Sequence, residues 1–228
     1  MRLSELQQAL RAADPAAVLV SPRVLDRLIQ SQHRLSNLFE QVPHNRCYVV
    51  ERQVLYRYVD QDELDLEPDR LLPATVILLA RPLADREGES LLLTYWRRLF
   101  HGCIHRALRQ EVSEGRLTAA TVRERIAEIG ASTFAEIRMV LGQERLLLPS
   151  EAQDETAVFI EFAAVYLELH YFARNLLPIY FPGLDNTAKI DELLARNVDA
   201  AALFAQTRLA GAPDPVVRTD TSSDESHD

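Results

Sequence analysis

The chain has 228 residues, of which 47% are hydrophobic and 26% charged, and its net charge is −9. The hydrophobic fraction is too high for a disordered protein, and two cysteines cannot form a disulfide scaffold. The apolar runs are far shorter than the roughly 20 residues of a membrane-spanning helix, and the acidic balance argues against nucleic-acid binding. We therefore expect a globular cytoplasmic protein without nucleic-acid or membrane partners.

The first quarter of the chain contains the two segments that favour β-structure. Residues 4–13 have leucines at helical spacing and predict a short amphipathic helix. Residues 16–20 and 47–50 are short apolar runs rich in valine, typical of strands. Between them Ser21 and Pro22 mark the start of a helix that we expect to reach about residue 39. A strand, a helix and a second strand in this order suggest a small βαβ-like element, an α/β appendage over residues 16–60.

The rest of the chain to residue 210 is predicted to be helical, apart from an acidic loop at residues 60–70 and a polar turn at 85–89. The expected helices cover residues 71–80, 90–112, 118–129, 132–142, 151–177, 187–197 and 200–209. The longest, 151–177, is apolar nearly all round between residues 158 and 177, which is typical of a central buried helix. The sequence thus predicts a mainly α, single-domain, helical bundle-like fold over residues 1–210.

Residues 211–228 differ from the rest in composition. This segment has five acidic residues, one arginine and few apolar side chains. Low hydrophobicity combined with high charge predicts a disordered acidic tail.

His101 and His105 stand four residues apart in the expected helix 90–112. Side chains at this spacing project from one helix face, and two imidazoles at these positions can coordinate one metal ion, as in the zinc motif HExxH. That motif's glutamate is replaced here by Gly102. Two partly exposed histidines at the edge of a helix face are the ordinary alternative, because such pairs also arise by chance.

Glu161 and Glu168 interrupt the apolar helix 151–177, and their spacing of seven places them on one face. A buried carboxylate must be paired with a cation, bound to a metal or protonated. Each acid is therefore a candidate metal ligand and a candidate catalytic residue.

Three kinds of partner could satisfy these two acids. The first expectation is a structural ion pair with an arginine of the other long helix, and the candidates there are Arg97, Arg98 and Arg106. The second is a divalent metal such as zinc, shared with His101 and His105. The third is a neutral acid with a raised pKa, poised for proton transfer. Glu136, on another apolar helix, could join any of these sets.

Four further residues lie near the histidines or have a metal-like spacing. Glycine inside a helix is tolerated where a backbone or ligand comes close, and for Gly102 we favour simple helix packing. Cys103 points away from both histidines and is expected in the core. His44 and Cys47 have metal-like spacing, but they would complete a site with the histidine pair only if the N-terminal element packs there.

The chain has no phosphate-binding glycine loop, no nucleophile elbow and no CxxC pair. This absence favours a non-catalytic interaction or regulatory module without a cofactor, whose partner is another protein. The alternative is a metal-dependent enzyme, a hydrolase, with His101, His105 and Glu161 or Glu168 as ligands. In that hypothesis the carboxylate that does not bind the metal is the catalytic base.

Overall fold

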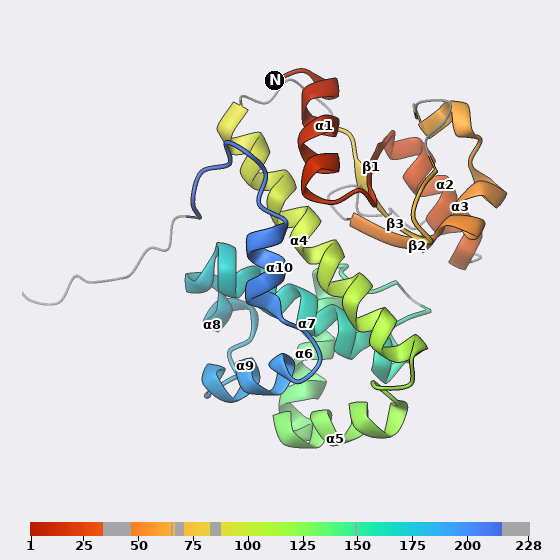
Figure 1. Cartoon of the computed structure of the whole chain (residues 1–228). Helices are drawn as coiled ribbons and strands as arrows, with labels where there is room; N and C mark the ends of the chain where they lie inside the picture. The colour runs from red at the N-terminus through yellow and green to blue at the C-terminus, as the bar shows by residue number, and fades with distance from the viewer. Residues whose placement is uncertain (34–46, 65, 67–70, 83–87, 149, 216–228) are drawn as a thin grey trace, which may run out of the picture.

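The computed structural model describes residues 1–33, 47–64, 66, 71–82, 88–148 and 150–215. The described chain is mainly helical and carries one small sheet near its N-terminus (Figure 1), which confirms the expected fold class. Among the described residues no helix combines the length and apolarity needed to cross a membrane.

The N-terminal elements alternate between helix and strand. In chain order they are α1 (Leu3–Ala13), β1 (Ala17–Val20), α2 (Pro22–His33), β2 (Cys47–Glu51), α3 (Arg52–Tyr58), a 3-10 helix (Gln61–Leu64) and β3 (Thr75–Ala80). The hydroxyl of Ser21 accepts a hydrogen bond from the Val24 N–H, as expected of the residue that caps α2. Of the predicted helix 22–39, residues 34–39 lie outside the described residues.

The remaining elements are helical. They are α4 (Gly88–Ser113), α5 (Ala119–Ile129), α6 (Ala131–Gln143), α7 (Glu155–Phe172), a 3-10 turn (Arg174–Leu176), α8 (Leu177–Tyr180), α9 (Thr187–Ala195) and α10 (Ala200–Gln206). Of the predicted turn at 85–89, only residues 88 and 89 are described, and they form the first turn of α4.

The prediction of a helix at residues 71–80 is wrong, because residues 75–80 form β3, the central strand of the sheet. β1 pairs with β3 in parallel and β2 pairs with it antiparallel, so that Ala17 and Val49 both lie opposite Ile77. The two predicted strands are joined through β3 and not to each other. Five of the six residues of β3 are buried, on both faces of the sheet, so apolar and polar residues do not alternate along the strand. Without this alternation, the sequence of a short buried strand cannot be distinguished from that of a short buried helix.

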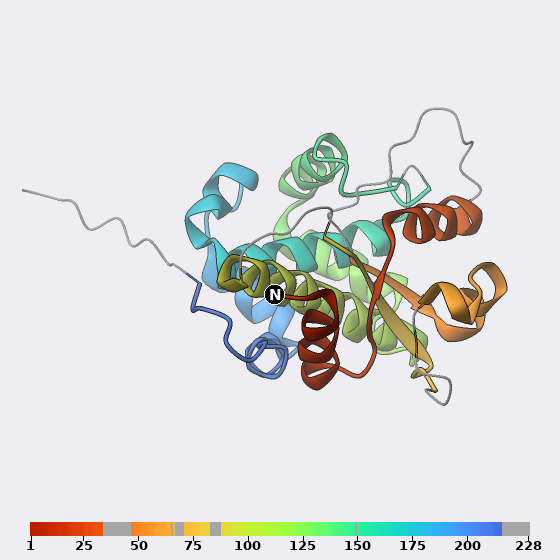
Figure 2. The same cartoon turned by 90° about the horizontal axis from the view of Figure 1, so that it is seen from above.

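The sheet divides the hydrophobic interior into two parts. Its face formed by Leu19, Val49 and Ile77 packs into the main core, to which α1, α4 and α7 contribute. The opposite face, with Val18 and Leu78, packs against α2 and α3 in a smaller core. Figure 2 shows the sheet between α4 on one side and α2 and α3 on the other. This arrangement brings β2 next to α4.

The central helix α7 is shorter than predicted. It begins at Glu155 because the Asp154 carboxylate accepts a hydrogen bond from the Thr156 N–H and caps it, and residues 151–153 form a turn. It ends at Phe172, where Ala173 leaves the helical conformation. Among the described helices α4 is the longest, at 26 residues. The prediction of a longest helix over 151–177 is therefore corrected.

Two further boundaries concern α6 and the tail. α6 begins directly after Gly130, whose φ of 106° turns the chain, and not at a cap formed by Ser132; Gly142 lies inside it. Of the predicted acidic tail, residues 211–215 are described, and Ala212 among them is buried. Residues 216–228 lie outside the described residues, so the disordered tail stays a prediction.

Candidate metal centre

Helix α4 carries four basic residues at intervals of four. They are Arg97, His101, His105 and Arg109. Helix α7 runs antiparallel to α4, since Arg97 near the start of α4 pairs with Glu168, and His105 farther along pairs with Glu161. The spacing of four on one helix and seven on the other therefore brings these basic and acidic groups into register.

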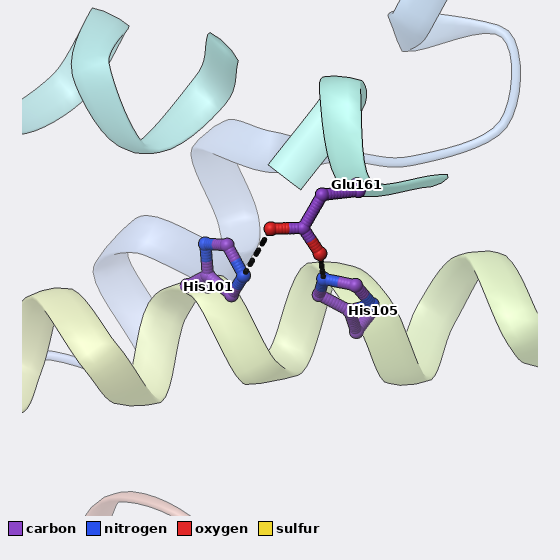
Figure 3. Close-up of side chains that lie close together, drawn as sticks. All are labelled: His101, His105 and Glu161. Atoms are coloured by element: carbon purple, nitrogen blue, oxygen red, sulfur yellow. Dashed lines mark ion pairs between the residues drawn. The ribbon is translucent and has the colours of Figure 1, made fainter. Parts of the chain in front are cut away.

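Glu161 lies between the two histidines (Figure 3). Its Oε1 is 3.9 Å from Nε2 of His101, and its Oε2 is 3.0 Å from Nε2 of His105. The two imidazole rings lie 4.8 Å apart, centre to centre. His101 and Glu161 are buried, with 8% and 6% of their surface exposed, and His105 is half-buried. Among the described residues these three form the group able to hold a metal ion, with ligating atoms all within 4.8 Å of one another.

Glu168 lies on the other side of the His101 ring. Its Oε2 is 2.8 Å from His101 Nδ1, although the ring N–H is not aligned along this contact, and its Oε1 pairs with Arg97. Burial raises the pKa of Glu168, but the contact with His101 and the charge of Arg97 outweigh it and hold the pKa below its ordinary value. Glu168 is thus an ionised group behind a histidine and not a member of the ligating group.

His105 is held in its neutral form. Burial lowers its pKa to about 4, and the contact with Glu161, which favours the charged form, does not compensate. Neutral imidazole is the form that binds metal ions, because the coordinating nitrogen must be deprotonated. At neutral pH no proton has to leave this ring before it can act as a ligand.

Two cavities meet at His105 and Glu161. The smaller, about 40 Å³, is bordered by Cys47 and Tyr48 of β2 and by side chains of α2. The larger, about 290 Å³, lies toward the exposed start of α7. Arg109 and Glu151 border both cavities.

Gly102 is where α4 comes closest to the sheet. A Cβ at this position would lie 2.6 Å from Cγ2 of Ile77 and 3.2 Å from Sγ of Cys47. The glycine thus serves packing, here of a helix on a sheet, and it lets β2 place Cys47 in the wall of the smaller cavity. The N-terminal element therefore does pack beside the histidine pair, although Cys47 is not a member of the ligating group and His44 lies outside the described residues.

The remaining predicted residues lie away from this cluster. Arg106 pairs with the buried Asp14, to which the Cys103 thiol also donates, at 3.3 Å. The guanidinium of Arg98 lies over the ring of Tyr95. On α6, the carboxylate of Glu136 packs against Gly183.

Sequence patterns did not single out Arg109, Glu151 or Tyr48. Arg109 had a signal, since it continues the spacing of four from His101 and His105. Glu151 had none, because its position depends on the turn before α7, where its Oε2 accepts a hydrogen bond from the Leu148 N–H at 3.0 Å.

The wall beside Tyr48 is held by a polar network. The Tyr48 hydroxyl donates to Gln32 Oε1 at 2.9 Å, so it accepts from His33 Nε2, also at 2.9 Å. The other ring nitrogen of His33 then accepts from the Ser150 hydroxyl, at 3.0 Å. Burial raises the pKa of Tyr48, so the phenol stays protonated and can make this donation. The network links α2 and β2 to the turn that carries Glu151.

Comparison of the chain with protein-family models, with curated proteins and with solved structures finds no match.

Proposed function

We propose that the protein is a metal-dependent hydrolase that holds a divalent ion of the zinc class between His101, His105 and Glu161. The observation that carries the proposal is the convergence of one ring nitrogen from each histidine and a carboxylate oxygen, all within 4.8 Å of one another. Zinc binds imidazole and carboxylate ligands at about 2.0–2.2 Å, so ligands of one ion lie no more than about 4 Å apart. The contacts of 3.9 and 3.0 Å already approach that geometry.

The surroundings of His101 support the same proposal. Histidines that bind metals usually donate their second ring nitrogen to a carboxylate, which fixes the ring orientation and raises its basicity. Glu168 occupies this position at Nδ1 of His101, and Arg97 holds Glu168 in turn. His101 lies between Glu168 and Glu161. An ion pair of Arg97 with Glu168 that only stabilised the fold would not need a histidine at this place.

Three protein ligands suit a catalytic site better than a structural one. Structural zinc sites are closed by four protein ligands, whereas catalytic sites have three and leave a position for water. The described residues supply three, and the adjoining cavities have room for water and a small substrate. A bound divalent ion would lower the pKa of a water molecule there and so make a nucleophile available near neutral pH.

The alternative is a non-catalytic interaction module. In that case Arg97 and Glu168 form a structural ion pair, and the histidines only satisfy the buried Glu161. The two functions differ in whether a metal binds.

The first experiment is elemental analysis of the purified chain after incubation with zinc and dialysis. We expect one zinc per wild-type chain and none in the His101→Ala, His105→Ala double variant. His170→Ala is the matched control, because this histidine of α7 pairs with Asp191 and lies outside the cluster. Metal-free wild type, or a double variant that retains full zinc, would refute the proposed function.

A further inference from the structure

The larger cavity beside the proposed metal centre has an uneven distribution of charge. Three carboxylates border it, those of Glu151, Asp154 and Glu161, against one guanidinium, that of Arg109. A divalent cation would bring this lining to neutrality. A phosphate ester entering the cavity would place further negative charge beside carboxylates, whereas an uncharged substrate would meet no such repulsion.

We infer that the substrate is an uncharged carbonyl compound, an ester or an amide, with Glu151 as the proton acceptor and Arg109 as the group that stabilises the oxyanion. The inference rests on the proposed function and adds to it the substrate class and two catalytic residues.

Glu151 belongs to the lining that the two cavities share with two of the proposed metal ligands. It is half-buried and borders both cavities, as do His105 and Glu161. Its Oε2 accepts the Leu148 N–H, which fixes the orientation of the carboxylate. The smaller cavity, about 40 Å³, has room for a few water molecules, since one needs about 10–15 Å³. A water at the metal and this carboxylate would then share one cavity.

Arg109 lies one turn of α4 beyond His105 and borders the same two cavities. Its Nη1 donates to the carbonyl oxygen of Val49 at 2.7 Å, which anchors the guanidinium against β2. This bond uses one of the five N–H donors of the guanidinium, and Arg109 is exposed. A fixed donor of this kind stabilises a single developing oxyanion.

These residues complete a balanced hydrolysis. The water oxygen forms a bond to the carbonyl carbon while its proton passes to Glu151, and the negative charge on the carbonyl oxygen is stabilised by Arg109. The bond from carbon to the leaving oxygen or nitrogen then breaks, and the leaving atom takes the proton from Glu151. Water and the acyl compound are consumed, an acid and an alcohol or amine are formed, and nothing is oxidised or reduced.

The test compares the binding of two probes to the zinc-loaded chain by calorimetry. They are acetohydroxamic acid, a small carbonyl compound that releases a proton when it binds a metal as acetohydroxamate, and inorganic phosphate. We expect acetohydroxamate to bind at least about tenfold more tightly. Glu151→Gln should weaken acetohydroxamate about tenfold, because the proton loses its acceptor, and should not weaken phosphate. Glu155→Gln, an exposed neighbour at the start of α7, is the control.

A second measurement uses two chromogenic substrates, para-nitrophenyl acetate and bis(para-nitrophenyl) phosphate. We expect cleavage of the ester alone, with kcat/KM reduced about a hundredfold or more in Glu151→Gln and in Arg109→Ala. Arg123→Ala, on the exposed side of α5, should match the wild type.

The outcomes separate the two proposals. A chain that does not bind zinc refutes both. Three results obtained with a chain that binds zinc would refute the inference alone. The chain could bind phosphate more tightly than acetohydroxamate, or it could cleave the phosphate diester as fast as the ester or cleave neither substrate. The Glu151→Gln variant could also behave like the Glu155→Gln variant.

Discussion

Nδ1 of His101 lies 2.8 Å from Oε2 of Glu168, and this contact leaves Nε2 of the same ring directed at Glu161. Two glutamates of one helix therefore have different positions relative to one histidine. One lies among the ligating atoms, and the other lies behind the ring with Arg97.

This arrangement predicts that Glu168 raises the affinity of the site for a metal ion that it does not bind. Glu168→Ala should lower zinc affinity about 10–100-fold, because His101 loses the carboxylate that orients it, while one zinc per chain still binds at saturation. Titration calorimetry measures this, with Glu136→Ala as the control. Loss of stoichiometric binding would instead make Glu168 a ligand, and unchanged affinity would leave it with no role at the metal.

Zinc should stabilise the folded chain, because its ligands join α4 to α7 and the unfolded chain lacks the assembled site. At a free zinc concentration about 100 times the Kd, linkage contributes about 2.7 kcal/mol to the free energy of unfolding. Thermal unfolding of the wild type should shift upward with zinc and return when EDTA is added. The His101→Ala, His105→Ala variant should show the same Tm with and without the ion, and a zinc-dependent shift in that variant would contradict this site.

Gly102→Ala should destabilise the fold although alanine favours helix. The new methyl would lie 2.6 Å from Cγ2 of the fully buried Ile77, and overpacking of this kind costs about 1–3 kcal/mol. Gly142→Ala is the matched control inside α6, because a Cβ there meets nothing within 4 Å and the helix propensity gain is about 1 kcal/mol. In urea unfolding, the midpoint of Gly102→Ala should lie below that of the wild type and the midpoint of Gly142→Ala above it. A stabilised Gly102→Ala would show that α4 can move away from the sheet at no cost.

The buried pair between Asp14 and Arg106 should make stability depend on pH in the acid range. Burial raises the pKa of Asp14, but the hydrogen bonds from Arg106 and Ala16 and the charge of Arg106 outweigh it, so the pKa lies below the ordinary value of 3.8. A depressed folded-state pKa gives stability that is fully present above 3.8 and is lost as the pH falls through the folded value. Protonation then leaves Arg106 without its anion.

Urea unfolding of the wild type and of Asp14→Asn between neutral pH and the acid range checks this pair. At neutral pH the variant should be destabilised by about 3–5 kcal/mol, the cost of breaking a buried pair, because it leaves Arg106 uncompensated. The difference between the two proteins should shrink as the pH falls below 3.8. A constant difference across this range would show that the charge of Asp14 is not what stabilises the fold.

Helical periodicity accounts for most of what could be predicted. The expected helix 90–112 agrees with α4 within two residues at its start and one at its end, and the pairing of Arg97 with Glu168 was among the expected ion pairs. The failures lie where periodicity carries no information. β3 is apolar on both faces, and α7 is limited by the cap at Asp154 and by Ala173, which leaves the helical conformation, although apolar residues continue past its end.

The spacing of residues along the chain determined which side chains share a helix face. His101 with His105 and Glu161 with Glu168 follow from steps of four and seven on an α-helix, which the backbone geometry dictates. Only the tertiary structure decided which of these groups meet. The packing of α4 against α7 sets their antiparallel register, and this register gives the two glutamates different neighbours. Glu161 lies between the histidines, and Glu168 lies between His101 and Arg97. Glu151 and Arg109 came together for the same reason, because a cavity is formed by segments distant in sequence and no spacing encodes its walls.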